Sequence, residues 1–152
     1  MLLNLEHEGR FDVLSDKLRL ASALTTALFS DVKIRTNPHS PTVRTDRIDQ
    51  LIRARAWNDA AFALVELELL AWKLRRLAYE DGEWHCSLSR QPNLPAALDD
   101  TAHASHEVMP LAILGALVEA HRGMSATRRI SFQTVPRARA ASGYAVCCDN
   151  FS

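Results

Sequence analysis

The feature that most constrains the fold of this chain is an Asp81-Gly82 pair between two segments of alternating character, Trp72–Tyr79 and Glu83–Arg90. Asp-Gly between such segments is a strong short-range signal for a β-hairpin with a two-residue type I′ turn. The sequence therefore predicts a hairpin in which these facing pairs form: Glu80 with Glu83, Tyr79 with Trp84, Leu77 with Cys86, and Arg75 with Leu88.

Alternation along the two strands gives the predicted hairpin two unlike faces. One face is apolar and collects Leu77, Tyr79, Trp84, Cys86 and Leu88. The opposite face is mixed and carries Trp72, Leu74, Arg76, Ala78, His85, Ser87 and Ser89. A slip of one residue would exchange the faces, and only this register gathers the large apolar groups together. We expect the apolar face to pack against helices.

Apolar residues at a spacing of three or four predict a first helix over residues 8–30. The breakers Asn37-Pro38 and Ser40-Pro41 predict a linker over 31–44. Thr45 or Asp46 is expected to cap the next helical stretch, which reaches about Leu69. Around Trp57-Asn58-Asp59 that stretch is either one kinked helix or two short helices, with Asn58 as a second cap.

After the hairpin, Pro92 and Pro95 predict a loop over 91–101. The last helix is expected to start near Ser105, with Pro110 in its first turns or at its true start. Its core stripe consists of Leu111, Leu114, Leu117 and Val118, with Ile113 beside it. Gly123 is expected to end it.

The expected fold class is α+β, with helices packed on a two-stranded antiparallel hairpin. The expected division is an N-terminal helical arm and linker at 1–43, an α-β-β-α core at 44–123, and a basic, partly ordered tail at 124–152. Trp72, Gly82-Glu83-Trp84 and Pro110–Leu114 carry a resemblance, over residues 57–122, to small bacterial and phage-associated α-β-β-α sandwich domains. That resemblance implies a fold and no particular activity.

Composition argues against several classes of function. The 152 residues include 18 basic and 18 acidic side chains, so the net charge is zero and gives no general attraction to nucleic acid or anionic lipid. The arginines of the tail, from Arg128 to Arg139, are read as a solvated segment. No apolar run is long enough for a bilayer, and the start lacks a signal-peptide pattern, so we expect a cytoplasmic protein. No phosphate-binding or hydrolase motif is visible, which favours a protein that is not an enzyme.

The sharpest candidate for chemistry is an acidic and histidine-rich run at 99–107. If the run is helical, Asp99, His103 and His106 share one face and could bind a divalent metal, with Asp100 or Glu107 as a further ligand. The alternative is a solvated run that enters the last helix. The spacing lacks the specificity of His-Glu-x-x-His, so we expect no obligatory cofactor.

The cysteines suggest little reactivity. Cys86 follows His85, but neighbours on a strand point to opposite faces, so Cys86 is expected to be a small buried hydrophobe. Cys147 and Cys148, followed by Asp149, could bind a soft metal or exchange disulfides. Adjacent cysteines chelate one ion poorly, and an anchoring role for this end of the chain is the simpler interpretation.

The leading functional hypothesis is therefore a non-catalytic interaction or accessory domain, and the alternative is the metal-binding protein. The expected contact surface is the mixed hairpin face, with Trp72, Leu74, Arg76, His85, Ser87 and Ser89. A lone hairpin has two open edges, and neutral charge favours self-association, so we expect a homodimer or a complex with another protein. Replacing Trp72 with alanine should then weaken association and leave the monomer folded.

Overall fold

The computed structural model describes residues 2–36, 42–95 and 97–133, and the side chains within 9–36, 46–95 and 97–124. Its elements, in chain order, are α1 (Leu2–Leu20), α2 (Thr26–Thr36), α3 (Thr42–Arg53), α4 (Trp57–Glu68), β1 (Lys73–Glu80), β2 (Glu83–Ser89), β3 (Thr101–His106) and α5 (Met109–Gln133). The chain divides into a unit of residues 1–122 and a second unit that begins at Gly123. The first unit holds the sheet, helices α1 to α4 and residues 109–122 of α5.

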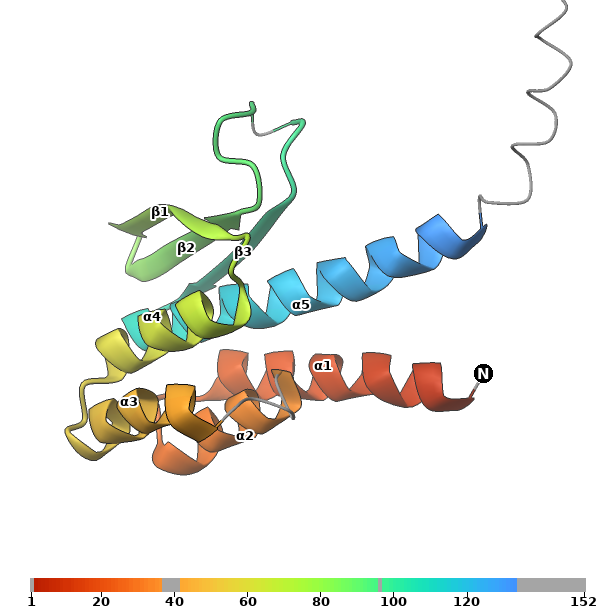
Figure 1. Ribbon diagram of the computed structural model, residues 1–152. Coiled ribbons are helices and arrows are strands. Elements are labelled where there is room, and N and C mark those ends of the chain that lie inside the picture. The colour runs from red at the N-terminus through yellow and green to blue at the C-terminus, as the bar shows by residue number, and fades with distance from the viewer. Residues whose placement is uncertain (1, 37–41, 96, 134–152) are drawn as a thin grey trace, which may run out of the picture. The chain divides into compact units, whose positions relative to one another are not determined.

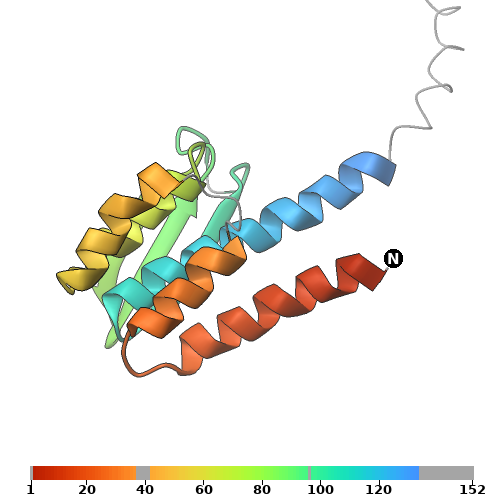
Figure 2. The ribbon, with the colours of Figure 1, turned by 60° about the horizontal axis from the view of Figure 1, so that its bottom comes forward.

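Helices and a small sheet form separate layers (Figure 1). The sheet has three antiparallel strands in the order β1-β2-β3, so the α+β class is confirmed. Helices α4 and α5 lie next to one face of the sheet, and α1, α2 and α3 lie beyond them, as the turned view also shows (Figure 2). The other face of the sheet is not covered by any helix in these views.

The predicted turn is confirmed. Asp81 and Gly82 both have positive φ, 54° and 85°, as a type I′ turn requires. Glu80 pairs with Glu83, and the predicted register holds as far as Arg76 with Ser87. The register then shifts between Leu74 and Arg76, so Leu74 and not Arg75 lies opposite Leu88. Because a β-bulge adds one residue to a strand, every residue before it changes its place in the alternation.

The expectation of a two-stranded hairpin is wrong, because residues 101–106 form a third strand. β3 pairs with β2, placing Ala102 opposite Leu88 and Ala104 opposite Cys86. Its sequence, Thr-Ala-His-Ala-Ser-His, holds two alanines and no large apolar residue, so local propensity does not predict a strand there. The backbone pairing with β2 is what makes this segment a strand.

The N-terminal region holds two helices, where the sequence predicted one over residues 8–30. Helix α1 ends at Leu20, and α2 begins at Thr26. The Thr25 hydroxyl caps α2 by accepting a hydrogen bond from the Leu28 N–H at 3.2 Å. Asp12 of α1 bonds to Arg122 of α5. Thr36 of α2 donates to Glu68 of α4 at 2.7 Å. The expected arm therefore lies against the rest of the 1–122 unit.

The open question about residues 45–69 is settled in favour of two helices. After α3, the Ala56 N–H bonds to the Leu51 carbonyl at 2.9 Å and the Arg55 N–H bonds to the Ile52 carbonyl at 3.0 Å. This pair of bonds is a Schellman motif, and it requires a left-handed residue, here Arg55 at φ 57°. Helix α4 then starts without a side-chain cap, so Asn58 is not the cap that the sequence suggested.

Helix α5 supplies much of the core. Leu111, Leu114, Leu117, Val118 and Ile113 are all buried, as their spacing predicted. The helix starts at Met109, so Pro110 lies in its first turn, where a missing N–H costs nothing. Gly123 does not end it. Gly115 lets α5 pack closely against β3, because a Cβ at this position would come within 2.9 Å of the Ala104 Cβ.

Candidate interaction surface

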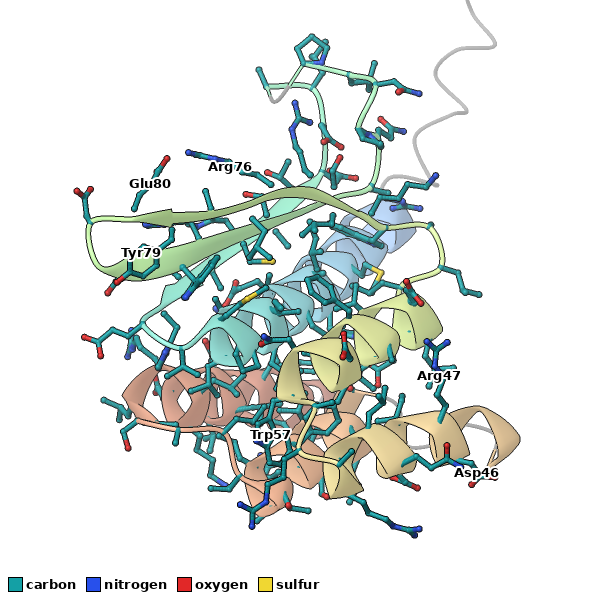
Figure 3. All side chains as sticks on the ribbon, turned by 90° about the vertical axis from the view of Figure 1, so that its left-hand side faces the viewer. Asp46, Arg47, Trp57, Arg76, Tyr79 and Glu80 are labelled. Carbon is teal, nitrogen blue, oxygen red and sulfur yellow. The ribbon has the colours of Figure 1, made fainter. Side chains whose placement is uncertain are left out.

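The surface that stands out is the face of the sheet that points away from the helices, which we call the open face. Alternation from the buried Cys86 and Leu88 assigns the odd-numbered residues of β2 and β3 to this side, and we restrict the name to 83–87 and 103–105 because Ser89, at the end of β2, is buried. Its members are Arg76, Ala78 and Glu80 of β1, Glu83, His85 and Ser87 of β2, and His103 and Ser105 of β3. Figure 3 shows Arg76 and Glu80 on the side of the sheet away from the helices.

Histidines and serines alternate at the centre of the open face. His85 lies opposite Ser105, and Ser87 lies opposite His103, on the two neighbouring strands. The two imidazole rings stack with centroids 5.7 Å apart and an interplanar angle of 23°. These short side chains lose little rotamer entropy on contact and offer both donors and acceptors. An ion pair between Arg76 and Glu80 borders them.

Of the six residues predicted for the contact surface, Arg76, His85 and Ser87 lie on the open face. Trp72 does not, because it precedes β1 and is only 9% exposed. Its N–H bonds to the Leu69 carbonyl at 2.9 Å. Leu74 is 45% exposed, as a contact residue would be, but it pairs with Leu88 and so lies on the side of the sheet that faces the helices. The bulge between Leu74 and Arg76 explains both corrections, because it breaks the alternation that grouped them with Arg76.

Ser89, the sixth residue, lies under a cluster of polar contacts at one end of the sheet. Its hydroxyl donates to the carboxylate of Asp99, whose side chain is fully buried. Asp99 also accepts from the Gln91 N–H at 2.7 Å and from Arg75 at 2.6 Å. Arg75 in turn reaches the Leu94 carbonyl at 3.4 Å. The cluster therefore fastens the segment between β2 and β3 to the sheet.

Two opposing effects act on the pKa of Asp99. Desolvation raises it, but the hydrogen bonds from Ser89, Gln91 and Arg75, together with the Arg75 charge, hold the pKa of this carboxyl below its ordinary value. Asp99 is therefore an ionised structural anchor at neutral pH. The sequence alone suggests a metal ligand at Asp99, because the partner that explains this carboxylate, Arg75, is 24 residues away.

The structure does not bring Asp99, His103 and His106 together. The helical spacing that grouped them is wrong, because 101–106 is a strand and residues three apart on a strand point to opposite faces. The His106 Nδ1 accepts the Val108 N–H at 2.9 Å, on the side away from His103. Among the residues whose side chains are described, no three His, Cys, Asp or Glu side chains gather where they could hold a metal ion.

The thiol of Cys86 is buried, and this burial raises its pKa to about 11. It is therefore protonated at neutral pH, where only the thiolate is a nucleophile. The predicted role as a small core residue agrees with this position. Cys147, Cys148 and Asp149 lie outside the described residues.

Sequence reasoning missed one buried polar cluster among the helices. The Glu68 carboxylate is only 1% exposed, and it accepts from Thr36 and contacts the His121 Nε2 at 3.1 Å. The His121 ring stacks on Phe11 of α1 with centroids 6.2 Å apart. The cluster joins four helices. Its carboxylate lies between the hydroxyl and the imidazole, whereas in a catalytic triad the imidazole lies between the hydroxyl and the carboxylate.

The comparisons with known proteins add no family to this description. No family model, no curated protein and no solved structure matches the chain. Within the described residues, no helix is both long and apolar enough to cross a membrane.

Proposed function

We propose that this protein is a non-catalytic interaction domain and that the open face of its sheet is the contact surface. The observation that carries the proposal is the one-sided covering of the sheet. Helices pack on the face of Cys86 and Leu88, while His103 and Ser105 on the other face are exposed and His85 and Ser87 are half-buried. A sheet face that no described helix covers is available to a partner.

The chemistry of the open face supports binding better than catalysis. Ser87 and Ser105 each lie opposite a histidine, but no described carboxylate bonds to either imidazole to orient it. An activated serine needs such an oriented base. A flat set of hydroxyl, imidazole and guanidinium groups instead suits hydrogen bonding to another polar protein surface.

We extend the proposal to a second copy of this chain as the partner. With 18 basic and 18 acidic residues, two copies do not repel each other through net charge. The open face also carries both signs of charge, with Arg76 on β1 and Glu83 on β2. A two-fold axis would bring each patch against its own copy, as in most homodimers.

Light-scattering mass tests this proposal with a matched pair of variants. Ser87→Arg puts a long charged side chain at the centre of the open face, and Gln50→Arg puts the same charge on the exposed side of α3. We expect a dimer for the wild type and for Gln50→Arg, and a folded monomer for Ser87→Arg. A monomeric wild type at about 100 μM, where a micromolar dimer would be nearly complete, would refute the homodimer. A dimer that survives Ser87→Arg would show that it uses another surface.

A further inference from the structure

The outer edge of β3 presents unpaired backbone groups. The Arg90 N–H bonds to the Asp100 carbonyl at 3.0 Å, which fixes the alternation of the β2–β3 ladder. Counting from that pair, Ala102, Ala104 and His106 direct their N–H and C=O groups toward β2. Those of His103 and Ser105 therefore point outward, and among the described residues no backbone hydrogen bond outside the sheet ladder meets them.

A groove runs along this edge. One hollow of about 260 Å³ lies between β3, α1 and α5, and Leu111, Gly115 and Glu119 contribute its α5 side. A second hollow, of about 380 Å³, continues toward the end of α1 and shares Arg19, Ser105 and His106 with the first. The floor is therefore built of helices, and the free strand edge is one wall.

The composition of the groove suits an extended chain. Leu111, Gly115 and Glu119 are spaced by one helical turn, so they form one stripe along α5. Gly115 has no side chain to fill the hollow, and it lets β3 approach α5 closely. Leu20, which lines the second hollow, is 80% exposed and offers an apolar contact. Leu18 and Leu111 border the first hollow, but they are only 2% and 1% exposed, so they close its base and offer little contact area.

We propose that this groove binds an extended peptide segment of another protein as a fourth strand of the sheet. Its backbone pairs with the outward N–H and C=O groups of His103 and Ser105, which only an extended chain can match in spacing. Alternate side chains of the peptide face the groove, where the exposed Leu20 favours an apolar residue and Arg19 and Glu107 favour charged ones. This site is distinct from the open face, because the edge uses the backbone of β3 and the open face uses side chains.

The test uses the full chain and a phage-displayed library of random peptides of about twelve residues, long enough for one strand. Affinities of a selected, synthesised peptide are then measured by fluorescence anisotropy. Ser105→Pro removes the outward N–H and spares the ladder to β2, as proline does at a strand edge. Ser105→Ala is the matched control, because it keeps the N–H. We expect Ser105→Ala to bind like the wild type, and Ser105→Pro to bind at least about tenfold more weakly.

A second measurement leaves the protein unchanged, in case Ser105→Pro fails to fold. Peptide analogues N-methylated on the edge that faces β3 should lose binding by about tenfold or more, and analogues methylated on the other edge should keep it. In hydrogen exchange, the amides of His103 and Ser105 should become protected when the peptide binds. The open-face variant Ser87→Arg should bind the peptide normally, so this inference and the homodimer can fail separately.

Three results would overturn the inference. The first is a selection that enriches no peptide on the wild type beyond those enriched on Ser105→Pro. The second is equal binding by analogues methylated on either edge. The third is a wild-type dimer that Ser105→Pro converts to monomer and Ser87→Arg does not, while no peptide is selected, since a second copy of the chain would then occupy the edge.

Discussion

Replacing Trp72 with alanine tests whether this residue is buried, as in the structure, or lies on an exposed face of the hairpin, as its place in the sequence pattern suggested. In the structure the side chain is about nine-tenths buried, where β1 begins. A tryptophan buries roughly 200 Å². At about 25 cal/mol per Å², removing most of it costs roughly 4 kcal/mol. A partly compact denatured state lowers that figure, so we expect a loss of about 3–4 kcal/mol in the free energy of unfolding.

The assay is urea denaturation of the full chain at one fixed protein concentration, monitored by circular dichroism. With a slope of about 2 kcal/mol per M, a loss of this size moves the midpoint down by roughly 1.5–2 M. Tyr79→Ala is the matched control, because Tyr79 is 58% exposed and contacts Trp84 with ring centroids 5.2 Å apart. It should cost only about 1 kcal/mol. If Trp72→Ala costs less than the Tyr79 variant, Trp72 is a surface residue and the reasoning fails.

Three further predictions concern the helix ends, the loop cluster and metal binding. Arg55→Gly relieves the left-handed strain at φ 57° and should stabilise the protein by about 0.5–1 kcal/mol in thermal melting, whereas a lower melting temperature would contradict the strain argument. Because the folded pKa of Asp99 is lowered, its contribution to stability is present above the ordinary carboxyl pKa of about 4 and is lost as pH falls through the lowered pKa. The stability difference between the wild type and Asp99→Asn should therefore shrink in urea titrations below about pH 4, and a difference that stays constant with pH would be evidence against the ionised anchor. Elemental analysis of purified protein should find far less than one metal ion per chain, because Asp99, His103 and His106 diverge; a stoichiometric metal that is lost in His103→Ala would refute this.

The open face could be predicted in part from the sequence. His85, Ser87 and Arg76 follow from the hairpin register, because the Asp81-Gly82 turn sets the pairing of the residues nearest to it. His103 and Ser105 complete the face only when β3 is known. No local pattern in residues 101–106 indicates a strand, so the positions of His103 and Ser105 on this face could not be predicted from the sequence.

What the sequence determined by itself are the features whose causes lie within a few residues. The positive φ values of the type I′ turn need Asp-Gly, and the buried stripe of α5 needs only its own spacing of leucines. The end of α3 at Arg55 could not be predicted in this way, because an arginine occupies the left-handed position where a glycine usually marks the end of a helix.

Only the tertiary structure decided β3, the bulge at Arg75 and the burial of Trp72. The first two involve partners far along the chain, because β3 pairs with β2 and Arg75, at the bulge, bonds to Asp99. Alanine and serine in β3 have weak preferences of their own, so the backbone hydrogen bonds to β2 and the close approach to Gly115 outweigh them. Local propensities are worth tenths of a kcal/mol per residue, and such long-range contacts together exceed them.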